Sequence, residues 1–441
     1  MAEFECLTFS GESYNCYGLE LVKRNLEIKG HKIYPFSLNS DRPVLISLYW
    51  PEQLYPFLRL RFHKNLKNRR IIVGGNYPTT SPNALLPFDV EVFMGDGELF
   101  DPFSESYMAG KDRKRAVIDE IHPILYEDLQ KNRRSFCELS RGCKNRCYFC
   151  QYGWLKPYRE ASLVDIEEIL RSVKTKSIRA FAADRTSHSR FSEIQKLFQK
   201  LGKTDTGSDV TLRGILKNPE TLEYLRKVRI GVEGMSYRIR KRIGKPFTDN
   251  EIVEFCRLVA KYGIKTMDWY MIYGLPGETP SEMESFCKLL DRIDAEMPEG
   301  YTIAIHWNAF SPSAQTPLQW YRPAMGKRQY LVDFANLWRG RKIKLTNRPL
   351  LTSDWTMIRR MLAIRSTPKT AKLVYNFAFH ESKFKKYPRH FLELFKETAG
   401  FDLVGPYPTD RPLPWDEYCD YERDKMLSIW GKVRKDAGEE A

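Results

Sequence analysis

One short loop decides how this sequence folds: it reads CKNRCYFC and covers residues 143–150. Its three cysteines, Cys143, Cys147 and Cys150, have the spacing C-x3-C-x2-C. Three thiolates are one short of the four ligands that a closed structural zinc site takes. They suit a four-iron cluster in which one iron lacks a protein ligand and is open to a small chelating molecule. The alternatives are a zinc site completed by a distant Cys or His, and a set of buried free thiols.

The sequence around this loop alternates strands with helices. Candidate strands cover residues 135–139, 178–183, 209–213, 229–233, 266–273 and 302–307, and helical patterns lie between them at 163–173, 189–201, 219–227, 249–261 and 281–293. Six such units predict a partial (β/α)6 barrel over residues 135–325, with its working face at the carboxyl ends of the strands. The cysteine loop follows the first of these strands, so we expect it at that face.

The first hundred residues show a second alternation of strands and helices. Strands are expected at 4–9, 31–36, 43–49, 70–73 and 89–94, and helices at 17–29 and 51–66. This α/β order predicts a Rossmann-like, doubly wound parallel sheet that binds ligands at the carboxyl ends of its strands. We place this domain at residues 1–110, a polar linker at 111–134, and a mostly helical, substrate-shaping region at 326–441.

Composition narrows the class of protein. The chain has 441 residues, of which 42% are hydrophobic and 13% aromatic, and this excludes global disorder. The formal charge of +15 suits an acidic partner, although the basic residues are dispersed. No apolar run reaches the roughly 18 residues of a membrane span, and residues 1–10 carry no basic signal-peptide segment. We therefore expect a cytoplasmic protein without disulfides.

The run ELSRGCKNRCYFC, residues 138–150, resembles the signature of radical S-adenosylmethionine (SAM) enzymes. In that family the open iron of a [4Fe-4S] cluster binds the amino and carboxylate groups of SAM. One electron then cleaves SAM to give a 5′-deoxyadenosyl radical. The resemblance covers roughly residues 135–325. It implies a [4Fe-4S] cluster and SAM as cofactors, and a one-electron reductant such as ferredoxin or flavodoxin as a partner.

Further segments resemble the parts of that family that hold SAM. They are AAD at 182–184, TLR at 211–213, GVEGMS at 231–236 and MIYGLPGET at 271–279. The resemblance implies SAM contacts from Asp184, Arg213, Glu233, Ser236 and Gly274. Considered alone, Glu233 or Arg213 could equally be half of a structural ion pair, and Gly274 could belong to a plain turn between a strand and a helix.

The N-terminal region resembles the cobalamin-binding domains that precede some radical SAM barrels. The matching segments are GGNYPT at 74–79, DVEV at 89–92 and GDGE at 95–98. The implied cobalamin contacts are Gly74, Gly75, Gly95, Gly97 and Glu98. Two glycines after a buried strand let the backbone approach a ligand closely. The alternative is a Rossmann-like domain that has lost its ligand or that only packs.

The mode of cobalamin binding is suggested by a missing motif. The loop SGESYNC, residues 10–16, lacks the D-x-H-x-x-G pattern whose His ligates cobalt in many cobalamin proteins. We therefore expect cobalamin to bind without a His ligand. The segment SLYW, residues 47–50, ends the third strand and points toward the ligand crevice. We expect Trp50, with Tyr49 as second choice, to cover the lower face of the corrin; an ordinary core or surface aromatic is the alternative.

Together the two resemblances imply a cobalamin-dependent radical SAM C-methyltransferase. One SAM would methylate cob(I)alamin, and a second would give the 5′-deoxyadenosyl radical that takes hydrogen from an unactivated substrate carbon. That carbon would capture the methyl group of methylcobalamin, so the cofactors supply the difficult chemistry. The alternatives are a radical rearrangement without methylation, a radical SAM enzyme that modifies RNA or a small metabolite, and a non-enzymatic scaffold.

A protein or peptide side chain is the substrate that we expect, ahead of nucleic acid. The sequence shows no recognisable RNA-binding module. Aromatic residues of the C-terminal region can anchor an extended peptide; they are Trp338, Trp355, Tyr375, Phe377, Phe379, Tyr387, Trp415 and Tyr418. In domain order the chain is similar to archaeal enzymes that C-methylate a glutamine of methyl-coenzyme M reductase.

Overall fold

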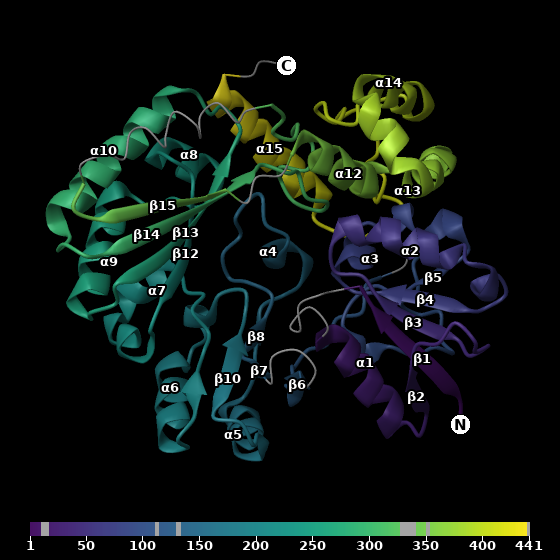
Figure 1. Ribbon diagram of the computed structural model, residues 1–441, viewed down its shortest axis with the longest axis horizontal. Coiled ribbons are helices and arrows are strands. Elements are labelled where there is room, and N and C mark those ends of the chain that lie inside the picture. The colour runs from purple at the N-terminus through teal and green to yellow at the C-terminus, as the bar shows by residue number, and fades with distance from the viewer. Residues whose placement is uncertain (10–16, 111–113, 129–133, 327–340, 350–352, 439–441) are drawn as a thin grey trace.

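The computed structural model describes residues 1–9, 17–110, 114–128, 134–326, 341–349 and 353–438. Two α/β lobes lie side by side, and helices of the C-terminal region run across the top of both (Figure 1). We call residues 3–100 the N-terminal lobe and residues 126–128, 134–326 and 344–349 the barrel lobe. The cysteine loop, residues 143–150, and the short helix α4 (Tyr152–Leu155) lie between them (Figure 1).

The N-terminal lobe is a doubly wound sheet, as its alternating pattern predicts. Its described strands are all parallel, in the order β2-β1-β3-β4-β5. They are β1 (Glu3–Thr8), β2 (Lys32–Pro35), β3 (Val44–Ser47), β4 (Ile71–Gly74) and β5 (Glu91–Val92), and the helices are α1 (Tyr17–Ile28), α2 (Leu54–Arg61) and α3 (Asn76–Thr80). The chain reverses its direction of winding between β1 and β3, which is where such sheets form a ligand crevice. The loop of residues 10–16, which lacks the His motif, lies outside the described residues.

The barrel lobe is an open barrel made of two half-sheets. The described strands have the orders β11-β10-β7-β6 and β12-β13-β14-β15. Their bounds are β6 (Tyr126–Asp128), β7 (Arg134–Glu138), β10 (Ser177–Phe181), β11 (Thr204–Asp205), β12 (Val228–Glu233), β13 (Thr266–Tyr273), β14 (Thr302–Ala309) and β15 (Lys344–Pro349). Among the strands that the structure describes in these two sheets, only β6 pairs antiparallel. A short hairpin of β8 (Ser140–Arg141) and β9 (Arg159–Glu160) follows β7.

The expected strand over residues 209–213 is wrong. A single parallel bridge, between Asp209 and Arg229, links the two half-sheets at this place. Helix α7 (Leu212–Lys217) then begins, because the side chain of Thr211 accepts a hydrogen bond from the backbone N–H of Gly214 at 3.2 Å. A threonine at this position caps a helix well, and this favours the helix over a longer strand.

Helices cover the outer face of the barrel. They are α5 (Leu163–Ser172), α6 (Phe191–Lys200), α8 (Tyr237–Arg242), α9 (Asp249–Lys261) and α10 (Ser281–Glu296). Residues 219–224 form a 3-10 helix in place of the longer helix expected at 219–227. Alternate residues of β12, such as Ile230 and Val232, are buried in the main hydrophobic core. Their neighbours Arg229 and Glu233 lie on the opposite face of the strand, toward the barrel interior, because side chains alternate along a strand.

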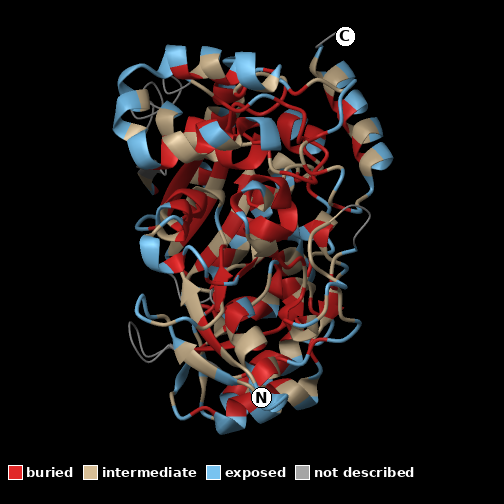
Figure 2. Ribbon diagram, turned by 90° about the vertical axis from the view of Figure 1, so that its right-hand side faces the viewer, coloured by how far each residue is buried: buried red, intermediate tan, exposed pale blue. Residues whose placement is uncertain are grey.

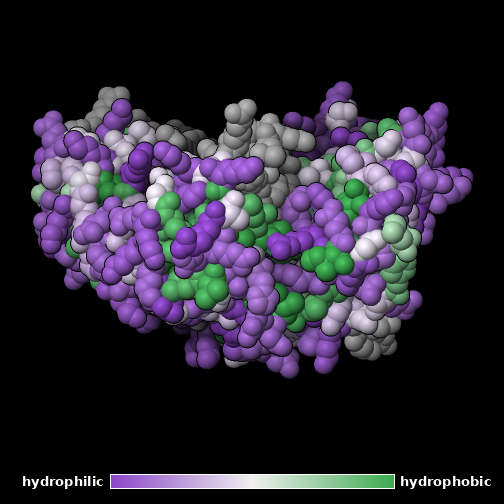
Figure 3. Space-filling model, turned by 90° about the horizontal axis from the view of Figure 1, so that it is seen from below, coloured by the Kyte–Doolittle hydropathy of each residue, from purple (hydrophilic) through white to green (hydrophobic). Residues whose placement is uncertain are grey.

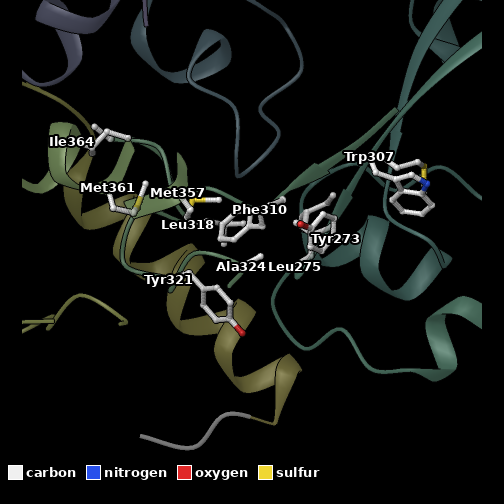
Figure 4. Packing of buried hydrophobic residues seen from close by; sticks show 14 of the residues in the cluster. Tyr273, Leu275, Trp307, Phe310, Leu318, Tyr321, Ala324, Met357, Met361 and Ile364 are labelled. Atoms are coloured by element: carbon white, nitrogen blue, oxygen red, sulfur yellow. The ribbon is translucent and has the colours of Figure 1, made fainter. Parts of the chain in front are cut away.

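The C-terminal region connects both lobes. It is mostly helical, as expected, with α12 (Asp354–Arg365), α13 (Ala371–Lys386), α14 (Pro388–Ala399) and α15 (Arg423–Ala437), but β15 also extends the barrel sheet. Buried residues of α12 continue the packing of the barrel's last strands (Figure 4). The hydroxyl of Tyr77 donates to the carbonyl of Ala363 at 2.7 Å, so the N-terminal lobe is anchored to the same helix.

Burial and surface chemistry agree with this packing. Buried residues fill the interior of both lobes, and exposed residues lie on the outer helices and loops (Figure 2). The face seen in Figure 3 is largely hydrophilic, with hydrophobic residues gathered in patches near its middle. Among the described residues, no helix is both long enough and apolar enough to cross a membrane.

Candidate active site between the lobes

A cavity of about 440 Å³ lies between the two lobes. The N-terminal lobe lines it with Ser47, Tyr49, Gly75, Gly95 and Gly97, among others. The barrel lobe lines it with Glu138, Arg141, Gly142, Arg179, Phe181 and Asp209, among others. Most of these residues lie at or just beyond the carboxyl ends of parallel strands. The two ligand-binding edges that the sequence predicts separately therefore face one shared space.

Glycine is required at two turns on the N-terminal side of the cavity. Gly75 has a φ of +109°, and a Cβ atom there would lie 2.5 Å from the carbonyl oxygen of Leu48. Gly95 has a φ of +124°, and its Cβ would collide with the backbone of Ala116. Thr79 joins the two turns, since its hydroxyl donates to the carbonyl of Gly75 at 2.8 Å and accepts from the N–H of Gly95 at 3.1 Å. At both positions neighbouring backbone fills the place of a side chain, so the packing of these turns requires glycine.

A second, smaller cavity of about 60 Å³ lies inside the N-terminal lobe. Gly74 and Gly97 line it together with apolar residues of α1, β3 and β4. A Cβ at Gly97 would meet the carbonyl oxygen of Gly18 at 2.8 Å, so α1 packs directly on this turn. Gly74, Gly75, Gly95 and Gly97 therefore gather at one edge of the sheet, as expected from their spacing.

The two aromatic candidates of the segment 47–50, Tyr49 and Trp50, lie in different surroundings. Tyr49 lines the large cavity, and its hydroxyl forms a short hydrogen bond with that of Tyr152 on α4. Trp50 packs edge-on against Tyr49, with ring centroids 4.7 Å apart, but 46% of it is exposed and it lines an outer hollow. Tyr49 is thus the better placed of the two to face a ligand in the cavity.

Asp96 is the centre of an ionic network that joins the lobes. Its buried carboxylate accepts hydrogen bonds from Lys156 at 2.6 Å and from Arg159 at 2.8 Å, and it lies 3.1 Å from a guanidinium nitrogen of Arg141. Burial opposes ionisation of this carboxyl, but the charges of Lys156 and Arg141 outweigh it and hold the pKa of Asp96 far below its usual range. Asp96 therefore stays charged and paired.

Arg141 extends this network to two further carboxylates. It binds Glu98 through two nitrogens, at 2.9 and 3.1 Å, and Glu138 at 2.7 and 2.9 Å. The carboxylate of Glu98, expected to contact cobalamin, is thus used to bridge from the N-terminal lobe to β8. The pairing of Asp96 with Arg141 was not predicted from the sequence. The available signal was an acidic turn, GDGE, together with three basic residues flanking the cysteine loop.

The cysteine loop is held from several sides. The side-chain amide of Asn145 donates to Asp184 at 2.8 Å, the indole N–H of Trp154 donates to the carbonyl of Cys147 at 3.0 Å, and the N–H of Tyr148 donates to Ile243 at 2.9 Å. Asp184 therefore lies near the loop, where it orients Asn145. Two of its neighbours, Thr186 and Ser187, donate to the same carboxylate.

The three cysteines of the loop are buried or half-buried. Burial raises the pKa of the Cys147 thiol to about 11 and that of Cys150 to about 12. Within the described residues, no three His, Cys, Asp or Glu side chains are gathered tightly enough, as they stand, to hold a metal ion. The assignment of these cysteines as cluster ligands therefore stays a prediction, although three thiols on one short loop are the right donor set for an iron–sulfur cluster.

Glu233 lies beside this loop in a strained conformation. It ends β12 at an irregularity of the strand, with a φ of +65°, which is uncommon for a residue other than glycine. Its carboxylate accepts a hydrogen bond from Lys245 at 3.0 Å. Burial alone would lower the pKa of Lys245, but the negative charge of Glu233 and the hydrogen bond to it raise the pKa overall, so the ammonium is charged.

The remaining predicted SAM contacts lie in different surroundings. Ser236 caps α8 by accepting from the N–H of Ile239 at 3.3 Å. Gly274, with a φ of +77°, begins a turn. Its backbone N–H donates to the carboxylate of Glu278 at 3.0 Å. The placement of Arg213 at a strand end is wrong, because it lies exposed on α7 and pairs with Glu251 at 3.1 Å. This is the ion pair that the sequence left open as an alternative.

Comparisons with known proteins agree with this architecture. Residues 137–290 match the family model of the radical SAM superfamily. An uncharacterized protein of Methanocaldococcus jannaschii is 24% identical over 311 residues, which are 60% of this chain and 67% of that protein. TsrM of Kitasatospora setae, a radical SAM methyltransferase solved with cobalamin and a [4Fe-4S] cluster, superposes with a TM-score of 0.55 at 12% identity, over 99% of this chain and 100% of that one. OxsB, a cobalamin-dependent SAM radical enzyme solved with aqua-cobalamin, gives 0.52 at 12% identity, over 99% and 80%. These structures share the fold of the whole chain.

Proposed function

We propose that this protein is a cobalamin-dependent radical SAM C-methyltransferase, a proposal supported by the match of residues 137–290 to the radical SAM family model. The observation that carries the proposal is the shared cavity. One space of about 440 Å³ is lined by the glycine turns of the N-terminal lobe and by the barrel mouth beside the cysteine loop. A methyl donor and a radical source must both reach one substrate carbon, and a cavity shared by the two lobes supports such a reaction.

The proposal assigns residues to each group that this function needs. Cys143, Cys147 and Cys150 would hold a [4Fe-4S] cluster, and Glu233, Ser236 and Gly274 would lie along bound SAM. The glycine turns at 75 and 95, with Tyr49, would receive cobalamin, since all three residues line the cavity from the N-terminal lobe. When bound, these cofactors supply a transferable methyl group and a carbon-centred radical.

The chain itself contributes position and enclosure. The Asp96 network and the Tyr49–Tyr152 hydrogen bond fix the two lobes relative to each other on either side of the cavity. A fixed separation matters because a reactive carbon radical must meet its methyl donor before another hydrogen source.

For the substrate we propose a protein or peptide side chain, with a glutamine of methyl-coenzyme M reductase as the specific candidate. Of the aromatic residues considered for peptide anchoring, Phe377 and Trp415 are buried in the core, and Trp338 lies outside the described residues. Phe379 and Tyr387 are 40% and 57% exposed. Phe379, on α13, and Tyr387, which follows it, are exposed enough to contact a peptide, and this supports the proposed substrate class.

Product analysis tests this function. The reconstituted enzyme is incubated anaerobically with SAM, a low-potential reductant and either synthetic peptides of the reductase or bulk tRNA. We expect a peptide to gain the mass of one methylene while both S-adenosylhomocysteine and 5′-deoxyadenosine form. 5′-Deoxyadenosine without S-adenosylhomocysteine would contradict methyl transfer and favour a rearrangement. A gain on tRNA alone, or on a free metabolite alone, would overturn the peptide proposal.

A further inference from the structure

The segment that follows α8 is locked against the cysteine loop. The N–H of Tyr148, in the middle of the loop, donates to the carbonyl of Ile243 at 2.9 Å. Gly244 has a φ of +73°, and a Cβ there would meet the ring of Tyr148 at 2.8 Å. The next residue, Lys245, donates its own N–H to Arg240 at 2.9 Å. The position of Lys245 relative to the loop is therefore fixed by backbone contacts on both sides.

The side chain of Lys245 is directed inward and is mostly buried. Its ammonium donates to Glu233 at 3.0 Å, and 15% of the Lys245 side chain and 13% of that of Glu233 are exposed. Gly231 leaves room for the pair, since a Cβ there would lie 2.6 Å from the ammonium nitrogen. Lys245 directly follows Ile243 and Gly244, the two residues that contact Tyr148 between Cys147 and Cys150.

We propose that Lys245 sets the reduction potential of the iron–sulfur cluster on this loop, with Glu233 as the opposing charge. The inference rests on the proposed function in one respect, that the three cysteines hold such a cluster. Reduction adds one negative charge to the cluster, and a fixed positive charge nearby stabilises the reduced form. Lys245 is a positioning residue here, because it acts through the electrostatic field at the cluster.

Removing the charge of Lys245 and removing the charge of Glu233 should shift the reduction potential in opposite directions. Lys245→Met leaves the carboxylate of Glu233 uncompensated, so the potential becomes more negative. Glu233→Gln leaves the ammonium uncompensated, so the potential becomes more positive. The double variant Glu233→Gln/Lys245→Met removes both charges, and its potential returns close to that of the wild type. A merely structural role for the pair would not give shifts of opposite sign.

The test is an anaerobic redox titration of the reconstituted full-length protein, followed by electron paramagnetic resonance of the reduced cluster. We expect Lys245→Met to lower the ratio of reduced to oxidised cluster at a given potential about tenfold, which is a shift of about 59 mV for one electron. Lys245→Arg keeps the charge and should stay close to wild type. Lys241→Met, which removes an exposed lysine of α8, is the matched control.

The results of the titration distinguish a failure of the role of Lys245 from a failure of the proposed function. Equal potentials in the wild type, Lys245→Met and Glu233→Gln would overturn the role of Lys245 while leaving the cluster in place. Shifts of the same sign in both single variants would overturn it too. If the wild-type protein assembles no iron–sulfur cluster at all, the proposed function itself fails. Should Lys245→Met not fold, the Glu233→Gln variant still decides the sign, and the double variant should return the potential to that of the wild type.

Discussion

Asp96 shows how one residue can hold two lobes together. Its carboxylate, with a fully buried side chain, meets Arg141, Lys156 and Arg159, all of which come from the barrel side. Removing one partner of a buried ion pair leaves the other charges uncompensated, and this is far more costly than losing a surface pair.

We predict that Asp96→Asn lowers the free energy of unfolding by about 3–5 kcal/mol at neutral pH. The folded-state pKa of Asp96 is depressed, so its stabilisation is present above the unfolded pKa of about 3.9 and is lost as the pH falls below it. The difference in the free energy of unfolding between wild type and variant, measured by urea unfolding, should therefore become smaller as the pH falls below about 3.9. Asp119→Asn, at an exposed position, is the control, and an equal loss in both variants would contradict the role of Asp96.

A second prediction concerns the cysteine loop. Cys147→Ala should abolish binding of iron and sulfide after anaerobic reconstitution, because only two thiolates of the set would remain. Cys256→Ala, a buried cysteine on α9, should keep the iron content of the wild type. Normal iron content in Cys147→Ala would show that the loop does not hold the cluster.

A third prediction concerns the axial ligand of cobalt in bound cobalamin. No histidine is among the described residues that line the large cavity, and residues 10–16 contain none. Bound cob(II)alamin should therefore show no nitrogen superhyperfine splitting from an axial ligand in electron paramagnetic resonance. Tyr49→His should introduce that splitting and Trp50→His should not, since Tyr49 lines the large cavity and Trp50 lines an outer hollow. Splitting in the wild type would refute this account of cobalamin binding.

Sequence analysis found residues whose chemistry imposes a fixed local spacing. The cysteine loop and the glycine turns belong to this class, because three ligands or a tight turn need neighbouring residues. Arg213 was misplaced because a threonine cap turned an expected strand into a helix. Asp96 was missed because its partners lie far along the chain, and a pairing between lobes leaves no local pattern.

At the scale of elements, strong periodicity gave accurate bounds. The helix expected at 249–261 is α9, and the strand expected at 266–273 is β13. Short elements with mixed signals were predicted poorly. Residues 209–213 alternate like a strand but pass into α7, and β15 has too few apolar residues to stand out within a mostly helical region.

The turn after β5 offers a prediction at this scale. Gly95→Ala should destabilise the protein more than Gly263→Ala, although both glycines have positive φ. At Gly263 an added Cβ meets no atom within 4 Å, so the substitution costs about 1–2 kcal/mol of backbone strain alone. At Gly95 the Cβ also collides with Ala116. Thermal unfolding compares the two variants, and equal losses would show that the close approach at residue 95 is unimportant.

At the scale of the whole molecule, the two lobes could be predicted and their arrangement could not. Each lobe has its own strand–helix alternation, which fixes a fold class from local pattern. The way the lobes face each other depends on contacts between distant segments, such as Tyr77 with Ala363 and Asp96 with Lys156. The shared cavity follows from these contacts, and with it the central claim that two cofactor sites act on one substrate.

The presence of two cofactor sites in one chain is tested most directly by the cofactor content of the full-length protein. This content is measured after anaerobic reconstitution with iron, sulfide and cobalamin. The account predicts about four iron, four sulfide and one cobalamin bound per chain. A protein that retains iron and sulfide but no cobalamin would contradict the claim, as would one that retains cobalamin without a cluster.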